Sequence, residues 1–287
     1  MSAAVMIRRF PPSIIDKDHP DYSMLSKIRD GIYAAAGGAV RLHAELPSLL
    51  KEAVDFVLDP AKTGRTSIAD LDKVEKTFIG LKVEHFLRDK LGAPKGLRRD
   101  LQIDGQDVDI KNTIGTTWMI PPETYQNEEP CLLIATAKFD GRCWLGILLA
   151  RENYLGAKNR DGKKSVTAEG KRNILWLVED APYPASAWAE IDMARFRELR
   201  QIKGGKKRAA QFFRENLGKK IDRSIVESLL HDQRDFMKRV RGNGGARDDL
   251  KKEKILILSG IYDAKEAKRR GIALKRDEFV AVRISKV

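Results

Sequence analysis

The chain of 287 residues is 42% hydrophobic and 33% charged, which is typical of a globular protein and excludes a disordered or fibrous chain. Its length is comfortable for two domains, and its formal net charge of +13 favours an acidic partner. The N-terminus lacks the apolar core of a signal peptide, the longest apolar runs fall far short of the roughly 18 residues of a membrane span, and only two cysteines occur. We therefore expect a cytoplasmic protein without a membrane partner.

The first ninety residues are expected to be helical. Apolar residues recur at helical spacing over Tyr22–Ala36 and again over Leu46–Leu58. Gly37-Gly38 and Asp59-Pro60 are helix-breaking pairs that should end these two segments.

A third helix is predicted to begin near Ser67, where a capping residue is followed three positions later by Asp70, and to end at Gly92. Glu84 would lie on a largely apolar face of this helix. A carboxylate withdrawn from water needs a partner or a metal, so Glu84 is a candidate site residue. By the three-and-four rule, that face holds Thr77, Gly80, Leu81, Glu84, Leu87 and Leu91.

Asp104-Gly105 predicts a two-residue hairpin turn, because a type I′ turn requires positive φ at both central positions. The register that follows opposes Leu101 to Val108 and Asp100 to Asp109. Because side chains alternate along a strand, Asp100, Asp109 and Lys111 should share one face, together with Asp107.

Opposed like charges destabilise a strand pair, so Asp100 and Asp109 need a cation between them. A divalent metal such as Mg²⁺ prefers carboxylate oxygens and would resolve the repulsion, with Lys111 adding positive charge. An ordinary solvated hairpin with a polar outer face is the open alternative at this point.

Two nearly continuous apolar runs, Cys131–Ala137 and Cys143–Ala150, predict strands covered on both faces, with a turn at Asp140-Gly141. A capped helix over Thr167–Val178 is expected to close the domain. Residues 1–180 are thus predicted to form an α/β (α+β) domain with a mixed sheet flanked by helices. The linker is placed at Ala181–Ala185.

The C-terminal third carries most of the positive charge. Residues 1–180 hold 27 Lys and Arg against 26 Asp and Glu, whereas residues 181–287 hold 27 against 15, a net charge of +12. So basic a region favours a nucleic-acid partner over a generally basic surface. Short helices followed by two strands predict a winged helix-turn-helix domain over residues 181–287. The helices are expected over Asp192–Ile202, Lys206–Leu217, Asp222–Leu230 and Asp232–Val240, with Asp222 and Asp232 as N-caps, and the strands over Lys254–Ser259 and Phe279–Ser285.

Candidate DNA contacts lie on the last of these helices and on the loop after it. The helix Asp232–Val240 would enter the major groove and carries Arg234, Lys238 and Arg239. The glycine-rich loop that follows holds Arg241, Asn243 and Arg247, and its glycines allow close approach to phosphates. No Gly-Lys-Ser/Thr follows, so a nucleotide cofactor is not expected; a flexible linker is the alternative interpretation.

The chain resembles the NaeI-type restriction endonucleases, a branch of the PD-(D/E)xK nucleases, from roughly Lys51 to Gly260. The segments that carry the resemblance are Thr63–Arg65, Glu75–Thr77, Val83-Glu84, Gly105–Lys111, Trp118–Glu123, Asn159–Asp161 and Asp235–Arg247.

The resemblance implies that Glu84, Asp100, Asp109 and Lys111 form a Mg²⁺-dependent cleavage site. It also implies a bacterial, cytoplasmic homodimer that binds two double-stranded DNA sites, one cleaved and one an effector, at a short, GC-rich palindrome. Asn112 and Thr113, beside the catalytic strand, become candidate DNA contacts. Two alternatives stay open, a non-catalytic DNA-binding regulator and a nicking or repair nuclease.

Overall fold

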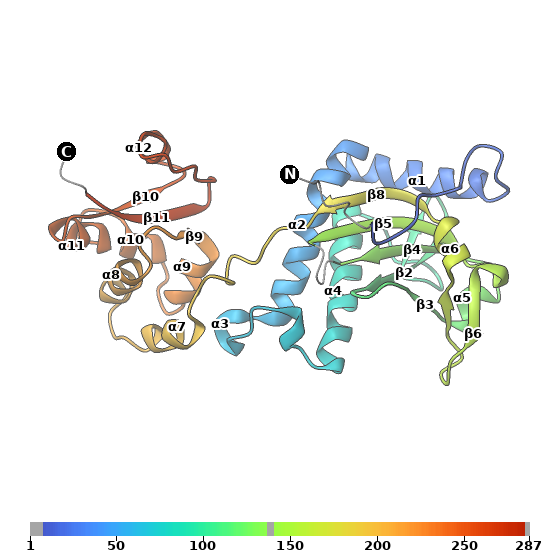
Figure 1. Cartoon of the computed structure of the whole chain (residues 1–287), viewed down its shortest axis with the longest axis horizontal. Coiled ribbons are helices and arrows are strands. Elements are labelled where there is room, and N and C mark those ends of the chain that lie inside the picture. Colours follow the sequence, from blue (N-terminus) through green and yellow to red (C-terminus); the bar gives the residue numbers. More distant parts are fainter. Residues whose placement is uncertain (1–7, 137–140, 285–287) are drawn as a thin grey trace, which may run out of the picture. The chain divides into compact units, whose positions relative to one another are not determined.

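The computed structural model describes residues 8–136 and 141–284, and the chain folds into two compact units (Figure 1). The first unit comprises Met1–Val57 and Leu71–Ala185, and the second comprises Leu58–Asp70 and Ser186–Val287. The sequence prediction has a single boundary after residue 180 and so assigns Leu58–Asp70 to the first domain, whereas this segment packs with the second unit. No helix among the described residues is long and apolar enough to cross a membrane.

A five-stranded mixed sheet, in the order β1-β2-β4-β5-β8, forms the centre of the first unit. β2 and β4 run parallel, whereas the other neighbouring pairs are antiparallel. The predicted mixed sheet is therefore confirmed. The strands are β1 Leu101–Ile103, β2 Gln106–Thr113, β4 Pro130–Ala135, β5 Arg142–Leu149 and β8 Leu175–Pro182, and β3 Met119–Ile120, β7 Lys164–Val166 and β6 Leu155–Lys158 form a separate small sheet.

Both faces of the large sheet are covered, as the apolar runs predict. Every residue of β4 is buried. On one face, Phe10 stacks on Trp118 and meets the edge of Trp144, with ring centroids 4.9 and 5.1 Å apart. Asp140, at the predicted turn between β4 and β5, lies outside the described residues. The helices of this unit are α1 Tyr22–Ala36, α2 Ala39–Leu58, α4 Lys73–Leu91, α5 Pro122–Tyr125 and α6 Ala168–Arg172, with a 3-10 turn at Glu152–Tyr154.

Three helix predictions in the first unit need correction. The second helix begins at Ala39 rather than Leu46, and its interior accommodates Pro47. Thr167 does cap a helix, but α6 ends at Arg172 and the apolar residues that follow form β8, which pairs with β5. Strand pairing in the sheet thus outweighs the helical periodicity of that short segment.

The helix that carries Glu84 begins later than predicted. Ser67 starts only a 3-10 turn, whereas α4 begins after Asp72, whose side chain and that of Glu75 form a reciprocal capping box. Its buried face is Ile79, Val83, Leu87 and Leu91, while Leu81 is 47% exposed. Glu84 therefore lies beside the core face of α4 and not along its centre. Gly92 ends the helix with φ +57°, as predicted.

The second unit combines short helices with a three-stranded sheet in the order β10-β11-β9. The two predicted C-terminal strands are confirmed as an antiparallel pair. Aromatic side chains, Trp188, Phe196, Phe212 and Phe213, fill its core. The elements are α3 Pro60–Thr63, a 3-10 turn Ile68–Asp70, α7 Met193–Arg200, α8 Gly205–Glu215, β9 Lys220–Asp222, α9 Arg223–Leu229, α10 Phe236–Val240, α11 Ala246–Lys252, β10 Ile255–Ser259, α12 Ala264–Arg269 and β11 Glu278–Arg283.

The predicted helix Asp232–Val240 is shorter than expected. α10 starts at Phe236, and its N-cap is Asp235, which accepts a hydrogen bond from the Lys238 amide. Asp232 is not a cap, because its carboxylate is held by the buried guanidinium of Arg208, with Nη1 2.6 Å from Oδ1. Asp222, by contrast, caps α9 as predicted.

Candidate active site

The hairpin β1–β2 has the predicted register. Leu101 pairs with Val108 and Ile103 with Gln106, and both turn residues, Asp104 and Gly105, have positive φ. The strand pairing stops at Leu101, so the part of β2 from Asp109 onward has no β1 neighbour on that side. An open strand edge therefore begins where the acidic residues are found.

Asp100 occupies this open edge with its side chain. Its Oδ2 accepts a hydrogen bond of 2.7 Å from the amide of Ile110, which satisfies a strand N–H that β1 leaves unpaired. The Asp100 carboxylate is thereby fixed beside β2.

Lys111 lies between the two carboxylates. Its Nζ is 2.5 Å from Oδ1 of Asp109 and 3.8 Å from Oδ2 of Asp100, and it donates to the backbone oxygen of Ile110 at 2.9 Å. The predicted need for a cation between Asp100 and Asp109 is thus met by the lysine itself. An ammonium group has three N–H donors. Because Asp100 is too far from Nζ for a hydrogen bond, the third N–H of Lys111 can be donated to an oxygen of another molecule.

Asp109 is the most deeply buried of these groups, at 4% exposure. Burial raises its pKa to about 6; Lys111 opposes the shift, and the nearby Asp100 adds to it. Its second oxygen, Oδ2, accepts a hydrogen bond of 3.0 Å from the hydroxyl of the fully buried Thr124. Both oxygens of Asp109 are therefore held in place.

Glu84 approaches the same cluster from α4. Burial raises its pKa, and the negative charge of Asp100 raises it further. Arg88, one turn along α4, lies 3.8 Å from Glu84 and donates to the backbone oxygen of Asp100 at 3.3 Å. The helix lies against β2 at Gly80, where a Cβ would be in ordinary van der Waals contact with Asn112, 4.0 Å away. The structure thus brings Glu84 to the electrostatic neighbourhood of Asp100.

Within residues 8–136 and 141–284, no three Asp, Glu, His or Cys side chains form a ready metal-binding group. The donors that do converge, Asp100 and Asp109, are hard oxygen ligands. Mg²⁺ is commonly held by one or two carboxylates together with substrate phosphates and water. The carboxylate pair therefore fits such an ion in donor chemistry, with substrate completing the set.

Sequence reasoning missed Thr124 and Arg88, which hold Asp109 and Asp100 respectively. Thr124 lies one residue beyond the segment Trp118–Glu123 that supports the family resemblance, so its place in the sequence was a usable signal. For Arg88, the only signal in the sequence was its spacing of four residues from Glu84 on the same helix. Cys131, the residue paired with Asp109 across β2 and β4, is fully buried, and burial raises the pKa of its thiol.

The predicted DNA contacts near the site have internal partners. Oδ1 of Asn112 accepts a hydrogen bond of 2.7 Å from Thr136, and Oγ1 of Thr113 accepts one of 3.0 Å from the amide of Gly115. These hydrogen bonds stabilise the end of β2. The side-chain nitrogen is then the group of Asn112 that can contact a ligand.

The predicted contacts of the second unit lie on and after α10. Arg234, Lys238, Arg239, Arg241 and Asn243 are exposed, and Arg247 is half-buried. Arg239 donates to Gln233 at 2.7 Å, and Arg247 to Asp263 at 2.6 Å. The structure therefore presents most of this group to solvent.

Asp109 and Lys111 lie on β2 and Asp100 lies beside them at the open edge of a mixed sheet, which is an arrangement of groups that a metal-dependent nuclease can use. The family model of the restriction endonuclease NaeI matches residues 43–287. The type II restriction enzyme NaeI of Lentzea aerocolonigenes is 33% identical over 250 residues, which cover 82% of this chain and 77% of that enzyme. The chain belongs to the NaeI restriction endonuclease family and is a type II site-specific deoxyribonuclease, so the resemblance stated from the sequence is confirmed.

Proposed function

We propose that this enzyme hydrolyses DNA phosphodiester bonds at the cluster of Asp100, Asp109 and Lys111, with Glu84 as a further acidic ligand and Mg²⁺ as the cofactor. The observation that carries the proposal is the position of Lys111. Its ammonium lies between two fixed carboxylates at the open edge of β2 and has one donor to spare. That arrangement supplies both the ligands and the positive charge that phosphodiester hydrolysis requires.

The cofactor, when bound by Asp100 and Asp109, supplies charge neutralisation and a more acidic water. Thr124 fixes the orientation of Asp109 by donating a hydrogen bond to its Oδ2. Lys111 donates its spare N–H to the attacking water or to a phosphate oxygen and so stabilises the developing negative charge. Arg88 positions the backbone that carries Asp100.

We infer that the second unit binds DNA as a winged helix-turn-helix domain. Its strand order β10-β11-β9, with α8, α9 and α11 packed against one another or the sheet, supports that architecture. The net charge of +12 over residues 181–287 supports DNA as the ligand. Six side chains are the proposed contacts, Arg234, Lys238, Arg239, Arg241, Asn243 and Arg247, with Asn112 and Thr113 acting near the cleavage site.

We further propose that the enzyme is a homodimer that cuts both strands of a short, GC-rich palindrome and is stimulated by a second DNA site. Two-fold symmetric DNA requires two symmetry-related cleavage sites, and each chain would supply one of them through Asp100, Asp109 and Lys111. Family membership supports the restriction activity on which this rests.

Plasmid DNA incubated with the enzyme and Mg²⁺ tests the function directly. Discrete double-strand fragments with uniform sequenced ends are expected. Nicked circles would indicate a nicking or repair nuclease, and an intact plasmid with a gel shift would indicate a DNA-binding regulator. Plasmids with one and with two cleavage sites, compared at equal site concentration, test the second-site requirement.

Single substitutions test the site assignment. Asp109→Ala and Lys111→Ala should each lower the cleavage rate by at least about 100-fold, because each removes a group that acts on the transition-state charge. DNA affinity measured without divalent metal should be unchanged. The controls Asp89→Ala and Lys17→Ala make the same charge changes at exposed positions of the same unit. Cleavage at the normal rate by a variant lacking both Asp109 and Lys111 would refute the assignment.

A further inference from the structure

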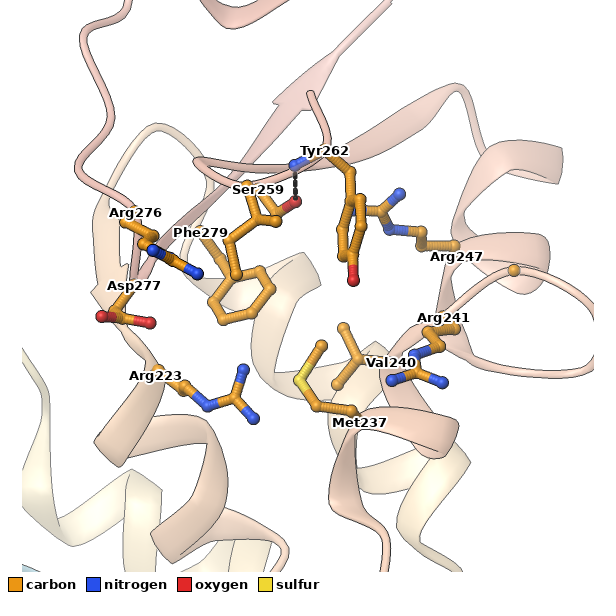
Figure 2. Close-up of a pocket in the computed structure, with 12 residues that line it drawn as sticks. Arg223, Met237, Val240, Arg241, Arg247, Ser259, Tyr262, Arg276, Asp277 and Phe279 are labelled. Atoms are coloured by element: carbon orange, nitrogen blue, oxygen red, sulfur yellow. Dashed lines mark hydrogen bonds between the residues drawn. The ribbon is translucent and has the colours of Figure 1, made fainter. Parts of the chain in front are cut away.

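A second cluster of charged residues surrounds a pocket in the second unit (Figure 2). We call it the arginine pocket. It encloses about 310 Å³ and lies within the size range of small-molecule sites. Its walls come from the start of α9, from α10 and the loop after it, and from the connection between β10 and β11. Four arginines line it, Arg223, Arg241, Arg247 and Arg276.

In the parts of the chain that the structure describes, three of the four arginines that line the pocket have no carboxylate in an ion pair with them. Among the described residues, Arg223, Arg241 and Arg276 have no ion-pair partner, whereas Arg195 and Arg214 in the same unit are paired with Glu215 and Glu253. One carboxylate, Asp277, lies on the rim. Converging unpaired guanidinium groups repel one another and favour an anion between them.

Arg247 provides a second indication of a ligand. Its Nη2 is bonded to Asp263, but its Nε is buried and has no hydrogen-bond partner within the described part of the chain. A buried donor without an acceptor is costly, and a bound anion would satisfy it.

The rest of the lining is apolar and aromatic. Phe279, Met237 and Val240 form the floor, and Phe279 is only 4% exposed. Tyr262 is 76% exposed, its ring points into the space above the floor in Figure 2, and its amide is held by Ser259 Oγ at 3.2 Å. A site for inorganic phosphate alone would not need such a floor, whereas a base stacks well on an aromatic ring.

We propose that the arginine pocket binds one nucleoside phosphate, with the base between Tyr262 and the apolar floor and the phosphate on the arginines. The ligand is either a nucleotide unit of a DNA strand or a free mononucleotide, since both present the same base and phosphate. The assignment rests on the proposal that this unit binds DNA, but it concerns binding and not cleavage.

Titration of the full chain with deoxyadenosine monophosphate, in low salt without divalent metal, tests the pocket. The nucleotide should bind at least about tenfold more tightly than deoxyadenosine or inorganic phosphate, because only the nucleotide uses both parts of the site. Tyr262→Leu should weaken binding by about 5- to 150-fold, the usual range for a lost base stack, while Tyr262→Phe should bind normally.

The double variant Arg241→Ala with Arg276→Ala should weaken binding by more than about tenfold. Arg269→Ala is the matched control, because this arginine lies outside the pocket, is paired with Glu266 and is 75% exposed. Absence of binding at millimolar nucleotide, equal affinity for inorganic phosphate, or normal binding by the Arg241 and Arg276 double variant would each overturn the proposal.

Competition identifies the source of the ligand. DNA that displaces the mononucleotide from the wild-type chain shows that a DNA strand supplies the nucleotide, and DNA that binds without displacing it indicates the free mononucleotide. Lys111→Ala separates this proposal from the nuclease proposal, since that variant should bind the mononucleotide normally. A protein that cuts DNA but does not bind the mononucleotide would overturn the pocket assignment and leave the nuclease proposal intact.

Discussion

Replacement of Arg208 should destabilise the second unit selectively. Arg208 is 3% exposed, and its guanidinium uses all five of its N–H donors. Two bonds go to the backbone oxygen of Ile202, at 2.9 and 3.1 Å, and one goes to that of Leu229, at 2.9 Å. The remaining two reach the carboxylate of Asp232 at 2.6 and 3.1 Å. One side chain thus joins the chain after α7, the end of α9 and the turn before α10.

The cost of Arg208→Met follows from these partners. Two backbone oxygens lose their donor, and each such loss costs about 1–3 kcal/mol when the group is buried. Asp232 is 43% exposed, so solvent screens its pairing with Arg208 and that share adds at most about 1 kcal/mol. We expect a total of roughly 3–5 kcal/mol, in the range measured when one member of a buried pair is removed. Arg214→Met, whose exposed partner is Glu253, should cost about 1 kcal/mol or less.

Urea unfolding followed by fluorine NMR of 5-fluorotryptophan-labelled protein can assign the effect to a unit. Of the four tryptophans, Trp188 lies in the core of the second unit, whereas Trp118 and Trp144 lie in the first. The Trp188 transition should move to lower urea in Arg208→Met, and the Trp118 and Trp144 transitions should move much less. A loss below about 1 kcal/mol at Trp188 would show that water replaces the guanidinium as a donor and would refute the reasoning.

Three further predictions concern the first unit. Thr124→Val removes the hydrogen bond to Asp109 Oδ2 and should slow cleavage about tenfold at unchanged DNA affinity, while Thr124→Ser should cleave normally; equal rates for both variants would contradict this role. Burial raises the pKa of Asp109 to about 6, and only the ionised carboxylate ligates a cation, so the cleavage rate at limiting Mg²⁺ should fall by up to about tenfold for each pH unit below about 6. A cleavage rate that stays constant from pH 5 to 8 would exclude the raised pKa. Gly170→Ala places a Cβ 2.3 Å from the backbone oxygen of Tyr154 and should destabilise the unit by at least about 2 kcal/mol in urea unfolding; a smaller loss would mean that α6 shifts freely.

The same pKa of Asp109 affects stability with a defined sign. Because the folded-state pKa lies above the usual value of 3.8, the neutral form is the one that folding favours. The contribution of this group to stability is therefore complete below about pH 4 and is lost as the pH rises through about 6. The ionised Asp109 carboxylate on which the proposed mechanism depends is therefore held at the expense of stability.

The hairpin that carries the proposed site could be predicted from the sequence because its geometry is local. The turn residues Asp104 and Gly105 fix the register, and the register alone places Asp109 and Lys111 on one face. Thr124 could not be placed in the same way, since its contact with Asp109 depends on how α5 packs against β2.

Elements decided by packing were harder to predict. The segment after Thr167 has residues suited to either helix or strand, and its pairing with β5 settles the choice. The start of α10 depends on Arg208, a residue 24 positions before Asp232, and the sequence gives no signal for that contact. The mixed sheet, in contrast, follows from long apolar runs whose burial on both faces requires no tertiary detail.

The segment Leu58–Asp70 has a consequence for how this enzyme can be divided. The polypeptide leaves the first unit after Val57, contributes α3 to the second, returns at Leu71 and departs again after Ala185. Neither unit is therefore one continuous stretch of sequence, and a truncation at the linker would separate the second unit from α3, which contacts α7 and α9. Exchange of the second unit between relatives by a single crossover would carry the same defect, so the two units are expected to be inherited together.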